Sequence, residues 1–243
     1  MTILVTGANG IVGRPLVKLL LSRGHKVIGL CRHPDWSVNV SGLQWLEGDV
    51  SKQCLGQSEE NWQNLCREVT TIFHLAARTD FKGQSIEEYR PTNIDGVRHI
   101  KEFAMAAEAW LHHVSTAFVC GKWPGEFSEN QLEEGQTFHN SYEESKYLGE
   151  LLLRQEPGPQ YTIYRPAIIL ERQPTSASPS VFGPFAFIDA VFRLCLGAVK
   201  KGGELQTIRV QGNPKAHLPL VFDDEVAQTL AILAERHAVH GAT

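Results

Sequence analysis

The sequence has few cysteines and no long apolar or basic run. Its five cysteines are an odd number with no Cys-x-x-Cys pair, so we expect reduced thiols and no metal site. The net charge is -4 and no block of lysine and arginine occurs, which argues against a nucleic acid as partner. No apolar run approaches the roughly 20 residues that span a bilayer. Met1 is followed by neither a basic nor a long apolar segment, so we expect no secretory signal and a soluble, cytoplasmic protein.

What the sequence does contain is an alternation of short β-rich runs with helical patterns. Near-continuous apolar strands between helices indicate an α/β fold, in which a doubly wound parallel sheet has helices on both faces. This is the Rossmann arrangement. The expected strands are 2–6, 26–31, 43–49, 70–77, 111–120 and 161–169, and the expected helices are 11–24, 58–69, 89–110 and one within 139–154.

The pattern changes after about residue 170, where a connection rich in proline and serine begins. Beyond it we expect an aromatic helix at 185–199, a strand at 218–222 and a helix at 223–237. The chain is therefore divided into a first domain, 1–170, and a small lobe, 171–243, packed over the carboxyl edge of the sheet. Four aromatic residues in the lobe could form core or wall an apolar pocket: Phe182, Phe185, Phe187 and Phe192.

A glycine-rich loop joins the first expected strand to the first expected helix. The stretch VTGANGIVGRPL places Gly7, Gly10 and Gly13 three residues apart. The first glycine allows a tight turn, the second lets the backbone approach a pyrophosphate, and the third lets helix and strand pack closely. The start of the helix offers unpaired N–H groups to the phosphates. A glycine triplet alone could be a structural turn, but at the start of an alternating α/β chain it predicts a dinucleotide site.

The end of the second strand indicates which dinucleotide binds. An NAD site usually has an acidic residue there, which holds the ribose 2′-OH. Here the strand is followed by Arg32, which could pair with the 2′-phosphate of NADP, and Arg14 could help. A solvated surface arginine is the alternative for Arg32. NADP(H) is therefore the preferred cofactor, and NAD(H) stays open.

The stretch HNSYEESKYLGELLLR sets Tyr142 and Lys146 four residues apart, on one face of a helix. Such a pair alone is often only part of the solvent-exposed face of a helix. Ser115 and Thr116, however, follow the fifth strand at the sheet edge where ligands bind. A phenol, an ammonium and a hydroxyl beside a dinucleotide suit hydride transfer to a carbonyl, with the phenol protonating the oxygen. We expect Lys146 to lower the pKa of the Tyr142 phenol and to hold the nicotinamide ribose.

Seven motifs in order make the chain resemble the extended short-chain dehydrogenase/reductases. They are TGANGIVG (6–13), GDV (48–50), HLAA (74–77), TNIDGVRHI (92–100), VSTAFV (114–119), YEESK (142–146) and YRPAII (164–169). The segment GDVSKQCLGQSEENWQNL is further similar to thioester reductase domains and to fatty acyl-CoA reductases, which are male-sterility-like proteins.

The resemblance implies a role for each matching residue. Thr116, Tyr142 and Lys146 would be catalytic, and Asn93 would support the active-site helix or a proton relay unless it is a helix-bending core residue. The cofactor-binding set would be Gly7, Asn9, Gly10, Ile11 and Val12 at the pyrophosphate, Arg32, Asp49 and Val50 at the adenosine end, and Leu75, Ala76, Ala77, Ser115, Tyr142, Lys146, Pro166 and Ile168 toward the nicotinamide.

The implied activity is NADPH-dependent reduction of a small-molecule carbonyl substrate. The preferred substrate is an acyl thioester of CoA or of an acyl carrier protein, giving an aldehyde or alcohol. The alternatives are an NAD-dependent sugar-nucleotide epimerase or dehydratase, a hydroxysteroid-type dehydrogenase, and a non-catalytic NADP-binding sensor. Relatives also form homodimers. The segment LERQPTSASPS departs from the Gly-acidic pattern of relatives, and the lobe is short, so we expect a reduced lobe or a truncated chain.

Several residues have simpler interpretations. His74 is expected to be structural lining, because no partners for a metal are found near it in the sequence. His112 and His113 are expected on the surface before the fifth strand. Cys31, Cys120 and Cys195 lie in apolar runs and are expected in the core, and Glu129, Glu133 and Glu134 are expected in a solvated loop.

Overall fold

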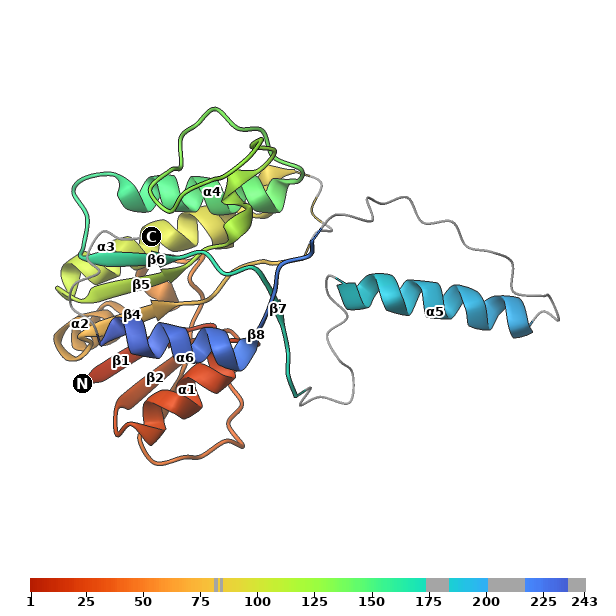
Figure 1. Cartoon of the computed structure of the whole chain (residues 1–243). Coiled ribbons are helices and arrows are strands. Elements are labelled where there is room, and N and C mark those ends of the chain that lie inside the picture. The colour runs from red at the N-terminus through yellow and green to blue at the C-terminus, as the bar shows by residue number, and fades with distance from the viewer. Residues whose placement is uncertain (81–82, 84, 174–183, 201–216, 236–243) are drawn as a thin grey trace.

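The fold was analysed in a computed structural model, which describes residues 1–80, 83, 85–173, 184–200 and 217–235. Six parallel strands form one sheet in the order β3-β2-β1-β4-β5-β6, the doubly wound order expected from the sequence (Figure 1). The strands are β1 (Thr2–Thr6), β2 (Lys26–Cys31), β3 (Leu43–Glu47), β4 (Thr71–His74), β5 (Trp110–Val114) and β6 (Tyr161–Tyr164).

Helices cover both faces of this sheet because successive strand residues point to opposite sides. On one face Leu4, Ile72 and Leu111 pack in a buried cluster with side chains of α2, α3 and α4. On the other face Ile3 and Phe73 pack with side chains of α1 and α6. The helices are α1 (Gly13–Ser22), α2 (Glu59–Glu68), α3 (Gly96–Ala106), α4 (Ser141–Arg154), α5 (Pro184–Lys200) and α6 (Asp223–Ala234).

The structure corrects the expected position of the two neighbouring histidines. His112 and His113 lie inside β5, and both are buried. The ring of His112 stacks on Phe73 with centroids 4.8 Å apart, and its Nδ1 lies 2.9 Å from the Tyr164 hydroxyl. A neutral imidazole can pack like an aromatic ring, and burial lowers the pKa of His112 to about 4. Both rings are buried because they find ring partners on the neighbouring strand β4, Phe73 for His112 and His74 for His113.

Beyond residue 164 the chain forms a second, two-stranded parallel sheet of β7 (Ile168–Leu170) and β8 (Leu220–Phe222). The helix that follows, α6, packs beside α1 through Val226 and Leu230. The division at residue 170 stays a prediction, but α6 belongs to the helix layer of the large sheet and not to a lobe over its carboxyl edge.

The aromatic helix α5 stands apart from the other layers (Figure 1). Phe192 is 59% exposed on this helix and does not line the cavity described below. Phe182 lies outside the described residues, and the side chains of Phe185 and Phe187 are likewise not described. Within the described part of the chain, no helix has both the length and the apolar character needed to cross a membrane.

The exposure of the loop glutamates agrees with the prediction, and that of the cysteines agrees only in part. Glu129, Glu133 and Glu134 are exposed in the loop before α4, as predicted. Cys31 is buried, also as predicted, while Cys120 and Cys195 are only partly buried.

Candidate active site

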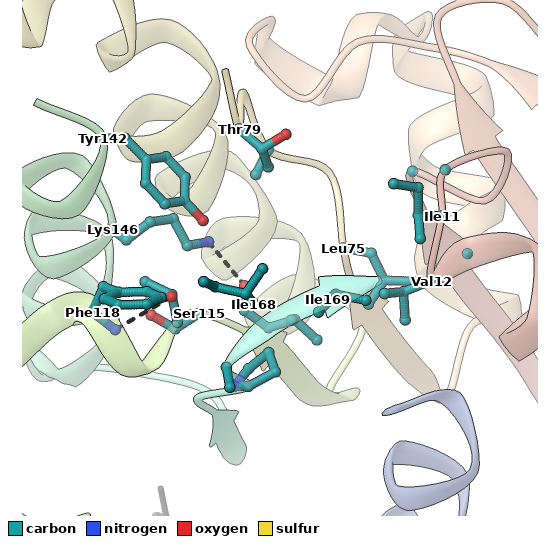
Figure 2. Close-up of a pocket in the computed structure, with 18 of the residues that line it drawn as sticks. Ile11, Val12, Leu75, Thr79, Ser115, Phe118, Tyr142, Lys146, Ile168 and Ile169 are labelled. Atoms are coloured by element: carbon teal, nitrogen blue, oxygen red, sulfur yellow. Dashed lines mark hydrogen bonds between the residues drawn. The ribbon is translucent and has the colours of Figure 1, made fainter. Parts of the chain in front are cut away.

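A cavity of about 570 Å³ opens at the carboxyl ends of β1, β4 and β5. In Figure 2, Ile11 and Val12 lie on one side of it, and Tyr142 and Lys146 reach in from α4 on the other. Ala76, Arg32, Asp49 and Val50 are not part of its lining. The predicted site residues that do line it are Gly7, Asn9, Gly10, Ile11, Val12, Leu75, Ala77, Ser115, Thr116, Tyr142, Lys146, Pro166 and Ile168.

The glycine loop forms one wall of the cavity and can exist only with glycine at its key positions. Gly7 has φ +68°, and a Cβ atom there would lie 3.0 Å from the backbone nitrogen of Ala76. A Cβ atom on Gly13 would lie only 2.1 Å from the carbonyl oxygen of Gly7. The helix that starts at Gly13 has no side-chain cap, and its Arg14 N–H donates to the Gly10 carbonyl oxygen of the loop at 3.1 Å. This bare backbone cradle fits the pyrophosphate of a dinucleotide.

The opposite wall is the first half of α4. This helix begins at Ser141 because the side chain of Asn140 accepts a hydrogen bond from the Glu143 N–H, 2.9 Å away. One turn into the helix, Lys146 is 3% exposed, and its Nζ donates to the carbonyl oxygen of Val114 at 2.8 Å (Figure 2). The cap therefore fixes where the helix begins, and the Lys146 bond fixes its position against the end of β5.

Thr116 stands where β5 gives way to a short helical turn, Ala117–Cys120. Its hydroxyl accepts from the Phe118 N–H at 3.3 Å and hydrogen-bonds with the Tyr142 side chain. The hydroxyl and the phenol are thus brought together from segments 26 residues apart in sequence. Both line the cavity, so a carbonyl oxygen placed there can meet the two groups at once.

The pKa of Tyr142 differs from the sequence expectation. Burial raises the pKa to about 12, the charge of Glu143 and the neighbouring Tyr89 add to the rise, and the hydrogen bond with Thr116 opposes it. The net shift is upward, opposite to the predicted lowering, because desolvation of the phenolate dominates. A phenol that stays protonated at neutral pH is the form that can donate a proton.

Lys146 carries the positive charge of the site. Its own pKa is lowered to about 8 by burial, while the charge of Glu150 opposes the shift. His74, packed behind the lysine, has its pKa lowered to about 3 by burial and by the Lys146 charge, so it is neutral. The Nδ1 atom of His74 lies 2.8 Å from the hydroxyl of Thr6. This neutral, buried contact is the structural role expected for His74.

The Asn93 side chain hydrogen-bonds to α4, the helix that carries Tyr142 and Lys146. It lies in a π-helical turn, Arg90–Asp95, that precedes α3, where the sequence had predicted one continuous helix. Its Nδ2 donates to the Ser145 hydroxyl at 2.8 Å, and its Oδ1 accepts from the Arg78 N–H at 2.8 Å. A Cβ atom on Gly149 would lie 2.7 Å from the Asn93 carbonyl oxygen, so glycine allows the close approach of α4. Sequence reasoning missed Ser145 and Gly149, although both lie on the same helix as Tyr142.

The residues predicted for the adenosine end lie at the ends of β2 and β3. Arg32 is exposed, and its charge, together with hydrogen bonds from Ser51, lowers the pKa of Asp49 against the opposing effect of burial. The side chain of Asn9 donates to the carbonyl oxygen of His33 at 3.0 Å, which links the glycine loop to this region. Val50 is a buried core residue.

Arg14 was expected to help at the 2′-phosphate, but it points elsewhere. Its Nη2 pairs with the Glu171 carboxylate at 2.6 Å, just past β7, and both residues line the cavity. Other lining residues that the sequence did not single out are Thr79, Val114, Phe118, Glu143, Ala167 and Ile169. All but Thr79 lie within the motifs VSTAFV, YEESK and YRPAII, but the motifs alone do not show which of their residues face the cavity.

A sequence profile of an NAD-binding family described as male sterility protein matches residues 38–230 of the chain. The chain belongs to this family. The carboxylic acid reductase of Segniliparus rugosus is 25% identical over 276 residues, which cover 95% of this chain and 23% of that protein. The 3-beta-hydroxysteroid dehydrogenase of Mycolicibacterium neoaurum is 28% identical over 166 residues, covering 65% of this chain and 44% of that protein.

Solved structures agree with the fold. The terminal R domain of the myxalamid PKS-NRPS pathway superimposes with a TM-score of 0.75 at 25% identity, covering 100% of this chain and 64% of that chain. UDP-N-acetylglucosamine 4-epimerase from Bacillus cereus superimposes with a TM-score of 0.67 at 16% identity, covering 98% of this chain and 76% of the epimerase chain. At this identity the likeness shows the fold alone. The chain spans about a quarter of the carboxylic acid reductase and under two thirds of the R domain.

These relatives are reductases and dehydrogenases, which confirms the predicted resemblance to the extended short-chain dehydrogenase/reductases. The family, the fold and the cavity agree with one another. The chain therefore belongs to an NAD-binding family whose relatives include reductases and dehydrogenases.

Proposed function

We propose that this family member reduces an acyl thioester to an aldehyde, using NADPH. The observation that carries the proposal is the meeting of Thr116, Tyr142 and Lys146 in the cavity whose far wall is the glycine loop. Two relatives, a carboxylic acid reductase and the R domain of a PKS-NRPS pathway, favour a carboxyl-level substrate. The thiol portion of the substrate would belong to CoA or to an acyl carrier protein.

The residues present fit a dinucleotide, which when bound supplies hydride to the substrate carbonyl carbon. Tyr142 then donates its phenolic proton to the carbonyl oxygen, and the Thr116 hydroxyl orients that oxygen beside the phenol. The resulting hemithioacetal loses the thiol, so one thioester, one hydride and one proton give one aldehyde and one thiol. A second round of the same steps would give the alcohol.

Lys146 supports the phenol in two ways. Its positive charge favours the phenolate that forms as the proton leaves, which lowers the free energy of the product side of the transfer. Its ammonium has three donors, and the bond to Val114 uses one, so two remain for the hydroxyls of a ribose. Because the amine is buried at the cavity wall, its charge acts with little screening by water.

The preference for NADPH over NADH is assigned to Arg32. Its exposed guanidinium follows β2, in the place where NAD sites usually carry an acidic residue. A planar guanidinium can bind a phosphate through two parallel hydrogen bonds. Asp49 lies near enough for the Arg32 charge to lower the pKa of its carboxyl, which supports the assignment of this guanidinium to the adenosine end.

An alternative is dehydrogenation or epimerisation of a secondary alcohol, with the same three residues running the proton transfer in reverse. The observations that favour it are the likeness to a hydroxysteroid dehydrogenase and, in fold, to proteins solved with UDP-sugars and NAD. A non-catalytic sensor is the third reading. Cofactor sensing without catalysis does not require the Tyr142 phenol and the Lys146 ammonium to line the same cavity.

The test measures NADPH consumption by the purified protein with acyl-CoA, an acyl-carrier-protein thioester or a free aldehyde. In parallel it measures NADH formation from NAD with a 3β-hydroxysteroid, and conversion of UDP-glucose in the presence of NAD. We expect NADPH oxidation with the thioesters and release of one thiol for each NADPH consumed in the first reduction. Turnover of the steroid or sugar nucleotide alone would replace the thioester proposal with the alternative. NADPH binding without turnover of any substrate would favour the sensor.

A further inference from the structure

One ion pair links the glycine-loop wall of the cavity to the segment after β7. Arg14 belongs to α1, directly after the glycine loop, and Glu171 follows β7, and both residues line the cavity. Arg14 Nη2 and Glu171 Oε1 are 2.6 Å apart, and Arg14 Nη1 also donates to the Asn9 carbonyl oxygen at 3.4 Å. The Arg14 side chain is 44% exposed, whereas that of Glu171 is 11% exposed. A cationic group that lies over the phosphate cradle is thus held by a carboxylate.

The chain around Glu171 is firmly anchored. The backbone N–H of the next residue, Arg172, donates to the Asp223 carboxylate at 3.0 Å. The Arg172 guanidinium pairs with Asp224 at 2.8 Å and Glu225 at 3.0 Å, at the start of α6. These contacts fix the position of the Glu171 carboxylate at the rim. When the ion pair opens, the exposed arginine is therefore the partner that moves.

We propose that Glu171 gates the dinucleotide cavity by holding Arg14 in an ion pair that the cofactor pyrophosphate must open. The pyrophosphate of a dinucleotide carries two negative charges, against one on the carboxylate, and it can accept the same bidentate, charge-assisted hydrogen bonds from a guanidinium. The arginine needs to turn only from the rim toward the adjacent glycine loop. Arg14 then becomes a pyrophosphate ligand, and the opened contact frees the mouth between α1 and β7.

The pyrophosphate is chosen over the 2′-phosphate because of where Arg14 points. Its guanidinium lies toward β7 and over the loop of Gly7 to Gly13, whereas Arg32 marks the adenosine end beyond β2. The pyrophosphate is common to NADPH and NADH. The gate should therefore act equally on both cofactors, in contrast to Arg32. The inference rests on the dinucleotide site and is independent of the thioester substrate.

The experiment measures dissociation constants for NADPH and NADH by the fluorescence of the reduced nicotinamide, without substrate. Glu171→Gln keeps the size of the side chain but removes the charge that competes for Arg14. We expect both cofactors to bind about three-fold tighter, in line with the modest strength of an exposed ion pair. Arg14→Gln should weaken the binding of NADPH and of NADH to the same extent, roughly ten-fold for one lost charge-assisted contact.

Glu235→Gln is the matched control. Glu235 pairs with Arg23 at 2.6 Å, also joins α1 to the end of another element, and lies away from the cavity lining. This variant changes the net charge by the same amount and should leave both constants unchanged. Unchanged or weaker binding in Glu171→Gln would overturn the gate. Tighter binding of NADPH alone would place Arg14 at the 2′-phosphate and overturn its assignment to the pyrophosphate.

Discussion

Lys146 donates a hydrogen bond from Nζ to the carbonyl oxygen of Val114, 2.8 Å away. This bond joins the second turn of α4 to the last residue of β5, and it holds a buried amine at the cavity wall. The position of the amine relative to Tyr142 therefore depends on the sheet as well as on helical spacing. The charge state of this amine should control the pH dependence of the enzyme.

We predict that kcat/KM for NADPH falls above about pH 8. Burial lowers the pKa of Lys146 to about 8, so the amine is charged below that pH and neutral above it. The neutral amine no longer attracts the cofactor or favours the phenolate. Tyr142 adds no loss in this range, because burial raises its pKa to about 12. The pH profile of kcat/KM reports groups of the free enzyme, which is the state described here.

Lys146→Arg provides the comparison, since a guanidinium stays charged throughout this range. Its residual activity should be lower, but the loss near pH 8 should disappear. Persistence of that loss in Lys146→Arg, or a wild-type profile that is flat to about pH 10, would assign the titration to another group.

We predict that Arg32→Gln weakens the binding of NADPH roughly ten-fold and leaves NADH binding unchanged. The physical reason is the loss of one charge-assisted bond to the 2′-phosphate, which NADH lacks. Fluorescence titration of both cofactors measures the ratio of the two constants. Arg67→Gln, an exposed arginine on α2, serves as the control for the change of charge. An equal effect of Arg32→Gln on both cofactors would show that this residue does not select between them.

We predict that Gly13→Ala destabilises the protein and abolishes dinucleotide binding. The new methyl group would lie 2.1 Å from the Gly7 carbonyl oxygen, so the loop or the start of α1 must move. Overpacking of this kind costs about 1–3 kcal/mol in the free energy of unfolding. Chemical denaturation gives the stability, and NADPH fluorescence gives the binding.

The control is Gly197→Ala, in α5, where a Cβ atom would meet nothing within 4 Å. It should keep both the stability and the binding of the parent protein. If Gly13→Ala bound NADPH as tightly as the parent, the close packing of this loop would not be what the site requires.

Local patterns in the sequence were enough to predict the sheet and most of the residues that line the cavity. The glycine loop and the Tyr142–Lys146 pair are short spacings within one strand–turn–helix or one helix, so they can be recognised without the rest of the chain. The order of the strands follows from the alternation of elements. These features were placed correctly because nothing distant in the sequence competes with them.

Contacts between distant segments could not be predicted in the same way. Arg14 finds Glu171, 157 residues later, and so turns toward β7 and away from the 2′-phosphate region. His112 is buried because Phe73 and Tyr164 on neighbouring strands receive its ring. The direction of the Tyr142 pKa shift depends on burial, which the spacing to Lys146 does not reveal.

The central claim is that the Tyr142 phenol donates the proton during reduction. It is tested most directly by Tyr142→Phe, which removes one hydroxyl from the cavity and keeps the ring. Tyr147→Phe is the matched control, because Tyr147 lies on the same helix, packs against Phe138 and does not line the cavity.

The measurement is NADPH oxidation with the best acyl thioester, alongside NADPH binding by fluorescence. We predict that Tyr142→Phe still binds NADPH but turns over at least about 100-fold more slowly, the usual contribution of a positioned acid, while Tyr147→Phe behaves like the parent. Parental turnover by Tyr142→Phe would contradict the account, because the proton would then come from another group.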